Sequence, residues 1–239
     1  MAIHLLGIVR ARDVARWETG RSDMPLRWVV AGELAGAVVG PQASAPDPVE
    51  LARVQAAIHQ RAALLPVQSG VALPDDAAVR RLLEARREEF ASSLDRVEGA
   101  CEMGLRIVLP HLRGPHFVPA SALPQAGEGL RADRAGAGRH GSRPVSPGDY
   151  LVSRRDYYAQ RDRRNQRTGS ATTAYVEALQ GSWREWHPLP DAPPGIVRMA
   201  FLVEGIRLPE FHVRFQEVRQ ARADERSVLL GPWPPYSFV

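Results

Sequence analysis

Short apolar runs, separated by polar stretches rich in glycine and proline, are the clearest pattern along the chain. Runs of this length between turn-forming residues are typical of β-strands. Two of them are separated only by Gly32 and Glu33, which predicts a hairpin because glycine readily adopts the backbone angles of a two-residue turn. The expected strands are residues 3–9, 28–31, 34–39, 64–73, 103–109, 196–203 and 228–230.

Helices are expected where apolar residues recur every three or four positions. The first begins after Asp47, since a capping aspartate followed by Pro48 and Glu50 is a helix-start signal. The second begins near Pro74 and is expected to continue as one helix to Gly99. Its apolar stripe consists of Val79, Leu82, Leu83, Phe90, Leu94 and Val97.

A long, strongly basic helical region is expected after Pro147, with Gly169 kinking or dividing it. A last helix is expected from Pro209, with Phe211 and Phe215 on its apolar face. The second half of the basic region keeps helical spacing at Thr172, Val176, Leu179, Trp183 and Trp186.

The order of these elements predicts an α+β fold with two domains. In residues 1–109, the order strand, hairpin, helix, strand, helix, strand is close to a ferredoxin-like arrangement with an altered first crossover, with its helices on one face of a small mixed sheet. Residues 148–239 are expected to form a C-terminal α+β domain that contains the long helical region. Between them, residues 110–147 are rich in Pro, Gly and Arg, and we interpret them as an interdomain linker or a mobile insertion, because a loop this long is uncommon inside a compact domain.

The last nine residues, 231–239, form a segment that we call the tail, and they combine prolines with aromatic residues. Proline fixes φ and lacks a backbone N–H, so the tail is expected to be extended rather than helical or part of a central strand. Trp233, Tyr236 and Phe238 then have two alternative roles. They strap the tail to its own domain, or they form an apolar surface that docks on a partner.

Composition and charge exclude several classes of protein. With 44% hydrophobic and 24% charged residues, the chain resembles a soluble globular protein, and no apolar run has the length of a membrane span. The single Cys101 fits a reducing cytosol, so we expect a cytoplasmic protein. The net charge of +4 permits an Arg-rich nucleic-acid-binding regulator as an alternative function, although most arginines are interleaved with Asp and Glu. The basic helical region, including Arg154 and Arg155, is either a solvated face or a contact for an acidic partner.

The candidate catalytic and metal-binding motifs lack the flanking elements or the further ligands that such sites require. Residues 136–141 match G-x-G-x-x-G, but no strand precedes them and no helix follows, as a dinucleotide site requires. His111 and His116 have no further ligands at a known zinc spacing. No nucleophile elbow or phosphate loop is present. We therefore expect no catalytic site, no metal, no cofactor and no enzymatic activity.

Several stretches, in the same order along the chain, resemble the gas vesicle GvpF/GvpL family. The tail is the most specific of them, because its Gly-Pro-Trp-Pro-Pro-Tyr-Ser-Phe sequence is similar to the C-terminal signature of that family. The other stretches are residues 5–9, 64–70, 102–107 and 148–155.

The resemblance implies a non-enzymatic accessory or minor structural protein that acts in gas vesicle assembly, by nucleating the shell or chaperoning the shell protein. It implies the main shell protein and other accessory proteins as partners, and the gas vesicle or the cytoplasm as the location. It also implies the two-domain α+β architecture. Nucleic acid and membrane are not expected partners. The residues expected to bind a partner are Trp233, Tyr236, Phe238, Arg154 and Arg155.

Overall fold

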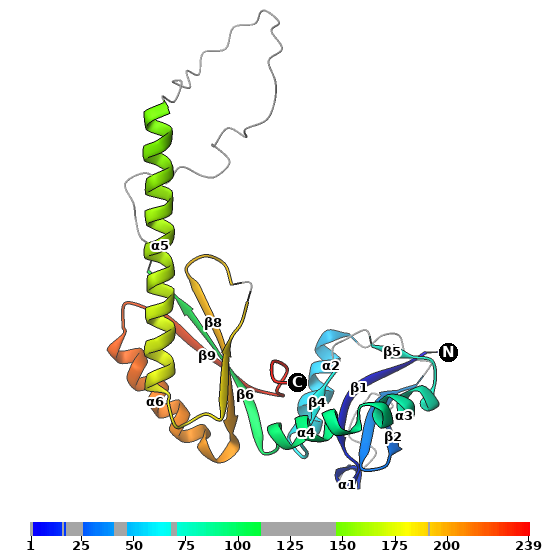
Figure 1. Cartoon of the computed structure of the whole chain (residues 1–239). Helices are drawn as coiled ribbons and strands as arrows, with labels where there is room; N and C mark the ends of the chain where they lie inside the picture. The colour runs from blue at the N-terminus through cyan, green and yellow to red at the C-terminus, as the bar shows by residue number, and fades with distance from the viewer. Residues whose placement is uncertain are drawn as a thin grey trace, which may run out of the picture.

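Two β-sheets with helices packed against them make up the fold, which Figure 1 shows for a computed structural model. The structure describes residues 2–15, 17, 26–40, 47–67, 71–110, 147–190 and 192–239, and at residues 147–157 and 160 it describes the backbone alone. Most of the expected linker, the glycine-rich motif at 136–141, His111 and His116 lie outside the described residues.

The first sheet contains β1 (Ile3–Arg10), β2 (Leu26–Ala31), β3 (Leu34–Val39), β4 (Leu65–Pro66) and β5 (Ala72–Leu73). Its strand order is β2-β3-β1-β4, β5 also pairs with β1, and every pairing is antiparallel. Gly32, with a φ of 58°, lies in the turn between β2 and β3, so the predicted hairpin is confirmed.

Helices cover both faces of the first sheet, so the expectation of helices on one face of a mixed sheet was wrong. α2 (Pro48–His59) packs on one face, and α3 (Asp76–Ala85) and α4 (Arg87–Val97) pack on the other. The reason is visible in β3, whose residues are all buried. A strand covered on both faces is apolar throughout, whereas a half-covered strand alternates apolar and polar residues.

The single helix expected from Pro74 to Gly99 is two helices, because Arg86 interrupts it with φ −117° and ψ 27°, outside the helical range. No proline or glycine marks this break in the sequence. The apolar stripe is common to both helices, with Val79, Leu83, Leu94 and Val97 buried in one core cluster.

The connectivity β1-α1-β2-β3-α2-β4, in which α1 (Ala11–Val14) is a single turn, follows the β-α-β-β-α-β order of a ferredoxin-like motif. The strand β5 is an addition to that order. The ferredoxin-like assignment, with its shortened first crossover, stays a prediction. The antiparallel sheet and its connections are the observed facts.

The second sheet has the order β7-β8-β6-β9 and contains β6 (Ala100–Val108), β7 (Glu185–Pro188), β8 (Ile196–Glu204) and β9 (Arg226–Trp233). The strand at 103–109 was expected to close the first sheet, and that expectation was wrong. All nine residues of β6 pair with β8, and β9 pairs with its other edge. The two neighbours of β6 therefore come from the C-terminal part of the chain.

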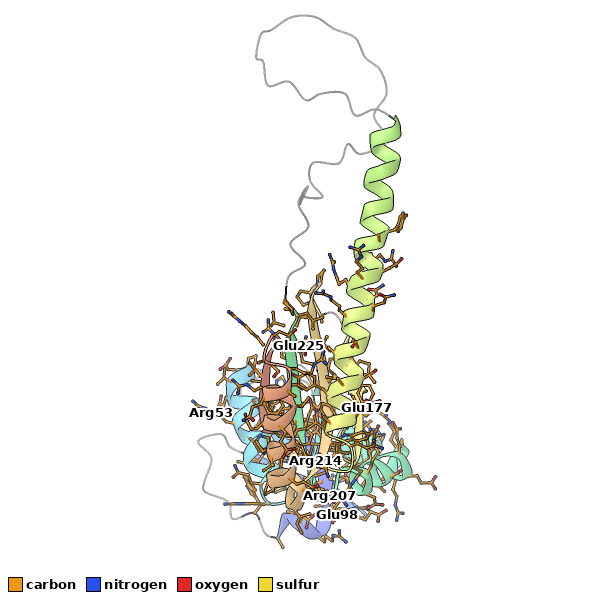
Figure 2. The ribbon with its side chains drawn as sticks, turned by 90° about the vertical axis from the view of Figure 1, so that its left-hand side faces the viewer. Arg53, Glu98, Glu177, Arg207, Arg214 and Glu225 are labelled. Atoms are coloured by element: carbon orange, nitrogen blue, oxygen red, sulfur yellow. The ribbon has the colours of Figure 1, made fainter. Side chains whose placement is uncertain are left out.

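Two helices, α5 (Pro147–Ala178) and α6 (Leu208–Ala221), cover one face of the second sheet. Figure 2 shows them side by side in front of it, with Glu177 on α5 and Arg214 on α6. α5 continues through Gly169 without a break. A short 3-10 helix, η2 (Gly205–Arg207), links β8 to α6.

The expected continuation of α5 through Trp183 and Trp186 was wrong. The helix ends at Ala178, and Gly181, with a φ of 84°, turns the chain soon afterwards. Trp186 then lies in β7, where its ring stacks on Phe201 with 6.3 Å between centroids. The tryptophans kept helical spacing by coincidence, since both pack against the same core from a non-helical segment.

Cys101 is buried in the core beneath α5 and α6, and burial raises the pKa of its thiol to about 11. Since the thiolate is the reactive form, we expect the folded protein at pH 8 to resist labelling by a disulfide reagent such as DTNB and to react fully after denaturation. Rapid labelling of the folded protein would contradict this placement.

Candidate partner-binding site

The tail begins inside the second sheet rather than after it. β9 continues to Trp233 on the edge of the sheet and pairs with β6 through a register shift between Glu102 and Gly104. Edge strands and bulges are the positions that tolerate proline. Gly231 has a φ of 115°, and a methyl group there would approach the Glu102 carbonyl oxygen to 2.7 Å. The tail was expected to be extended. It is a β-strand as far as Trp233, and it then turns back over the sheet.

A buried carboxylate holds the middle of the tail. Glu102 of β6 is only 4% exposed. Its carboxylate accepts hydrogen bonds from the backbone N–H of Ser237 at 2.7 Å and from the Ser237 hydroxyl at 2.8 Å. Hydrogen bonds to a charged acceptor are stronger than neutral ones, so this pair fixes the path of the tail.

A buried amide connects the tail to the first sheet. The Tyr236 hydroxyl donates to Gln55 Oε1 at 2.8 Å, and Gln55 Nε2 donates to the carbonyls of Leu6 and Val67 at 2.7 and 2.8 Å. Burial raises the pKa of the Tyr236 hydroxyl, and the Glu102 charge raises it further. One side chain of α2 thus joins β1, the residue after β4 and the tail.

Phe238 anchors the end of the tail. It is 1% exposed and packs in the core cluster that joins α3 and α4 to β8. Its ring lies 4.5 Å from the ring of His187 in β7, and Arg96 of α4 donates a hydrogen bond to its carbonyl oxygen. Phe238 therefore straps the tail down, and in this conformation its ring is not an exposed docking residue.

Trp233 and Tyr236 are different, because each keeps 40% of its surface exposed. Trp233 lies over Gly104, where a methyl group would meet its ring at 3.0 Å. Both rings are therefore partly exposed on a tail that is otherwise fixed, and their docking on a partner stays a prediction. Of the three aromatic residues in the tail, Trp233 and Tyr236 remain candidates for docking on a partner.

Arg154 and Arg155 lie on the first half of α5, where the structure describes the backbone alone. Between residues 158 and 170 the described side chains are exposed, apart from half-buried Thr168. Both figures show this half of α5 extending beyond the second sheet, away from the tail. The structure does not bring these arginines together with the tail, and their roles stay predictions.

Sequence reasoning missed Gln55, Glu102 and Ser237, which hold the tail. A signal was present for two of them. Gln55 lies on the apolar face of α2, and Glu102 interrupts an apolar strand. A polar residue at a core position indicates a buried hydrogen-bond partner, but the sequence does not say which residue that partner is.

Neither a cluster of metal-ligating side chains nor a membrane-spanning helix is present in the described part of the chain. No three His, Cys, Asp or Glu side chains come together there to hold a metal ion. No helix there is long and apolar enough to cross a membrane.

Comparison with solved structures shows a fold similar to that of the gas vesicle protein GvpF. Crystal structures of the gas vesicle protein GvpF from Microcystis aeruginosa and from Anabaena sp. PCC7120 both superpose with a TM-score of 0.69 over 99% of this chain. The matches cover 98% and 97% of those chains, at 12% and 14% sequence identity. At such identities the likeness concerns the fold alone.

Sequence comparison identifies the family. A family model described as "Gas vesicle synthesis protein GvpL/GvpF" matches residues 2–239. "Gas vesicle protein F" from Streptomyces sp. (strain CB03234) is 26% identical over the full length of both chains. "Gas vesicle protein L" from the same strain is 29% identical over 73% of this chain and 62% of its own length. The chain belongs to the GvpL/GvpF family of gas vesicle proteins, and these relatives give no support to the nucleic-acid-binding alternative.

Proposed function

We propose that this chain is an accessory or minor structural protein that acts in gas vesicle assembly, by nucleating the shell or chaperoning the shell protein, without catalysing a reaction. The observation that carries the proposal is the family match over residues 2–239. Its expected partners are the main shell protein and other accessory proteins, met in the cytoplasm or on the vesicle.

The physical reason for such a helper lies in the shell subunit. A protein surface that faces gas has no water to bind, so it must be apolar, and before assembly it promotes aggregation. A soluble helper with a preorganised apolar surface holds the subunit until it joins the shell. Trp233 and Tyr236 supply such a surface, because each ring is 40% exposed and its backbone is fixed by neighbouring hydrogen bonds.

Arg154 and Arg155 are proposed to add an electrostatic contact from α5. Exposed charges mainly accelerate and orient an encounter, whereas buried aromatic contacts supply most of the affinity. We therefore expect the arginines to affect the rate of association more than the stability of the complex.

The test is a co-expression pull-down of the cognate shell protein. We expect the wild-type chain to retain soluble shell protein. We expect the Trp233→Ala variant to retain less shell protein, by a factor of about ten or more, because loss of a central aromatic contact typically costs about 2 kcal/mol of binding free energy. Val213→Ala is the matched control, because Val213 is 58% exposed on α6, away from the tail.

Thermal unfolding of each variant separates docking from folding. Equal retention by a folded Trp233→Ala variant would contradict a docking role for the tail, while leaving a gas vesicle role intact. No retention by the wild-type chain would contradict binding of the shell protein itself.

A further inference from the structure

Described residues cover the face of the second sheet opposite α5 and α6 near the tail but leave side chains exposed farther along the strands. Near the tail, Phe238 belongs to the same core cluster as Ala200 and Leu202, and Ser237 binds Glu102. Farther along the strands the burial pattern changes. β6 is buried on both faces from Ala100 to Leu105, and then Arg106 is exposed.

The uncovered half is defined by the strand register. Directly opposite residues form three rows across β8, β6 and β9. They are Ala200, Gly104 and Leu230; Arg198, Arg106 and Val228; and Ile196, Val108 and Arg226. The first row borders the covered half, because Ala200 and Gly104 are buried and only Leu230 is exposed. In Figure 1 α5 and α6 lie on the other side of the sheet, and α2 and α4 approach this side near the tail. We call these three rows, together with Trp233, the open face.

Three apolar side chains lie exposed side by side on the open face. Val228 is 51% exposed, Leu230 41% and Trp233 40%. All three belong to β9, and Ile196 and Val108 beside them are half-buried. Contiguous exposed apolar residues on one sheet face mark an interaction surface.

The charges on the open face all have the same sign. Arg106 and Arg198 are direct cross-strand partners, and both are exposed. Neither forms an ion pair or a hydrogen bond with another side chain that the structure describes. Arg226 adds a third cation, and the three rows contain no Asp or Glu. Like charges directly opposite each other destabilise a sheet, so this pair needs an anionic partner to become favourable.

We propose that the open face binds an apolar polypeptide segment that carries one or two carboxylates, on a partner protein. The apolar residues of the segment cover Val228, Leu230 and Trp233, and its carboxylates pair with Arg106 and Arg198. Guanidinium groups bind carboxylates in a planar, two-bond geometry, which sets the register of the segment. We expect this partner to be a gas vesicle protein, and that part of the inference rests on the proposed function.

The tail shows in the same molecule how this sheet face receives a chain segment. Phe238 fills its apolar part, and polar groups of Ser237 meet the charge of Glu102. The open face continues that surface with the opposite charge, arginine in place of glutamate. The open face therefore selects an acidic segment, whereas Glu102 in the covered half selects groups that donate hydrogen bonds.

The experiment places the photo-crosslinking residue p-benzoylphenylalanine at Val228 in the full chain, in cells that make the cognate gas vesicle proteins. Val213 on α6, 58% exposed, is the matched control position. We expect a crosslinked partner peptide from position 228 that contains apolar residues and at least one Asp or Glu. We expect no such product from position 213.

Charge reversal tests the arginines. Together, Arg106→Glu and Arg198→Glu are expected to lower the crosslink yield at least tenfold, and the two Arg→Gln changes are expected to lower it less. Both side chains are exposed, so the Arg→Glu pair, which keeps two like charges opposite each other, should melt like the wild type. The Arg→Gln pair removes that repulsion and should melt at the same temperature or slightly higher. Arg53→Glu with Arg219→Glu makes the same charge change at exposed positions on α2 and α6, and Figure 2 labels Arg53; this control should stay within twofold.

The outcomes separate this inference from the proposed function. A gas vesicle partner captured through a basic segment, or captured equally after charge reversal, would overturn the open-face inference and leave the proposed function standing. An acidic, apolar segment of a protein unrelated to gas vesicles would support the inference and count against the proposed function. Crosslinks to the chain itself or to a second copy, or no product from position 228, would overturn the inference.

Discussion

Replacing Phe238 with alanine is expected to lower the free energy of unfolding by about 3–5 kcal/mol, as for other large aromatic residues removed from a core. Phe238 is 1% exposed and belongs to a core cluster that includes residues of both sheets and of α4. Its loss leaves a cavity beside His187 and removes the apolar contact that holds the end of the tail. Urea denaturation followed by circular dichroism measures the change.

The neighbouring Val239 provides the control for Phe238. It is 52% exposed, so Val239→Ala is expected to change stability by no more than about 0.5 kcal/mol. Equal and small effects at both positions would mean that the tail leaves the core in solution. The strap would then be absent, and all three aromatic residues of the tail would become available to a partner.

Gly231→Ala is expected to destabilise the protein by about 3 kcal/mol or more, because backbone strain and a steric clash act together. The φ of 115° at Gly231 is a conformation that L side chains rarely adopt. The added methyl group would also lie 2.7 Å from the Glu102 carbonyl oxygen and 3.1 Å from Met103 Sδ. Since Gly231 begins the tail, the same change should displace Trp233.

Gly169→Ala is the matched control, and its effect on the stability of the protein should have the opposite sign. Gly169 lies inside α5, and a methyl group there would meet nothing within 4 Å. Alanine is a better helix former than glycine, so stability should rise by about 0.5–1 kcal/mol. If both glycine variants were equally stable, the path of the tail described above would be wrong.

Local patterns predicted most of the elements, and the mistakes arose where tertiary packing decides. The hairpin at Gly32 depends on turn chemistry, and the helices that begin near Pro48 and Pro209 each carry a proline in the first turn; both signals act over a few residues. The expected cap at Asp47 was wrong, because its side chain makes no capping hydrogen bond. The sheet to which β6 belongs depends on its neighbours β8 and β9, both from the C-terminal part of the chain, which no local pattern encodes. Trp186 fits helical spacing, but its packing on Phe201 places it in a strand.

The candidate site was predicted in part. The unusual composition of the tail identified Trp233, Tyr236 and Phe238, but their separate roles depend on burial in the folded protein. Phe238 is buried, whereas Trp233 and Tyr236 are partly exposed. The polar groups that hold the tail come from α2 and β6, far away in the sequence. Only the fold brings these residues together.

The central claim is that this protein acts in gas vesicle assembly, and removal of its gene tests that claim most directly. In cells that carry the remaining cognate gas vesicle genes, electron microscopy would count vesicles without the protein, with the wild-type chain and with the Trp233→Ala variant. We expect few or no vesicles without the protein, recovery with the wild-type chain, and incomplete recovery with the variant. Vesicles of normal number and shape in cells that lack the protein would contradict the account.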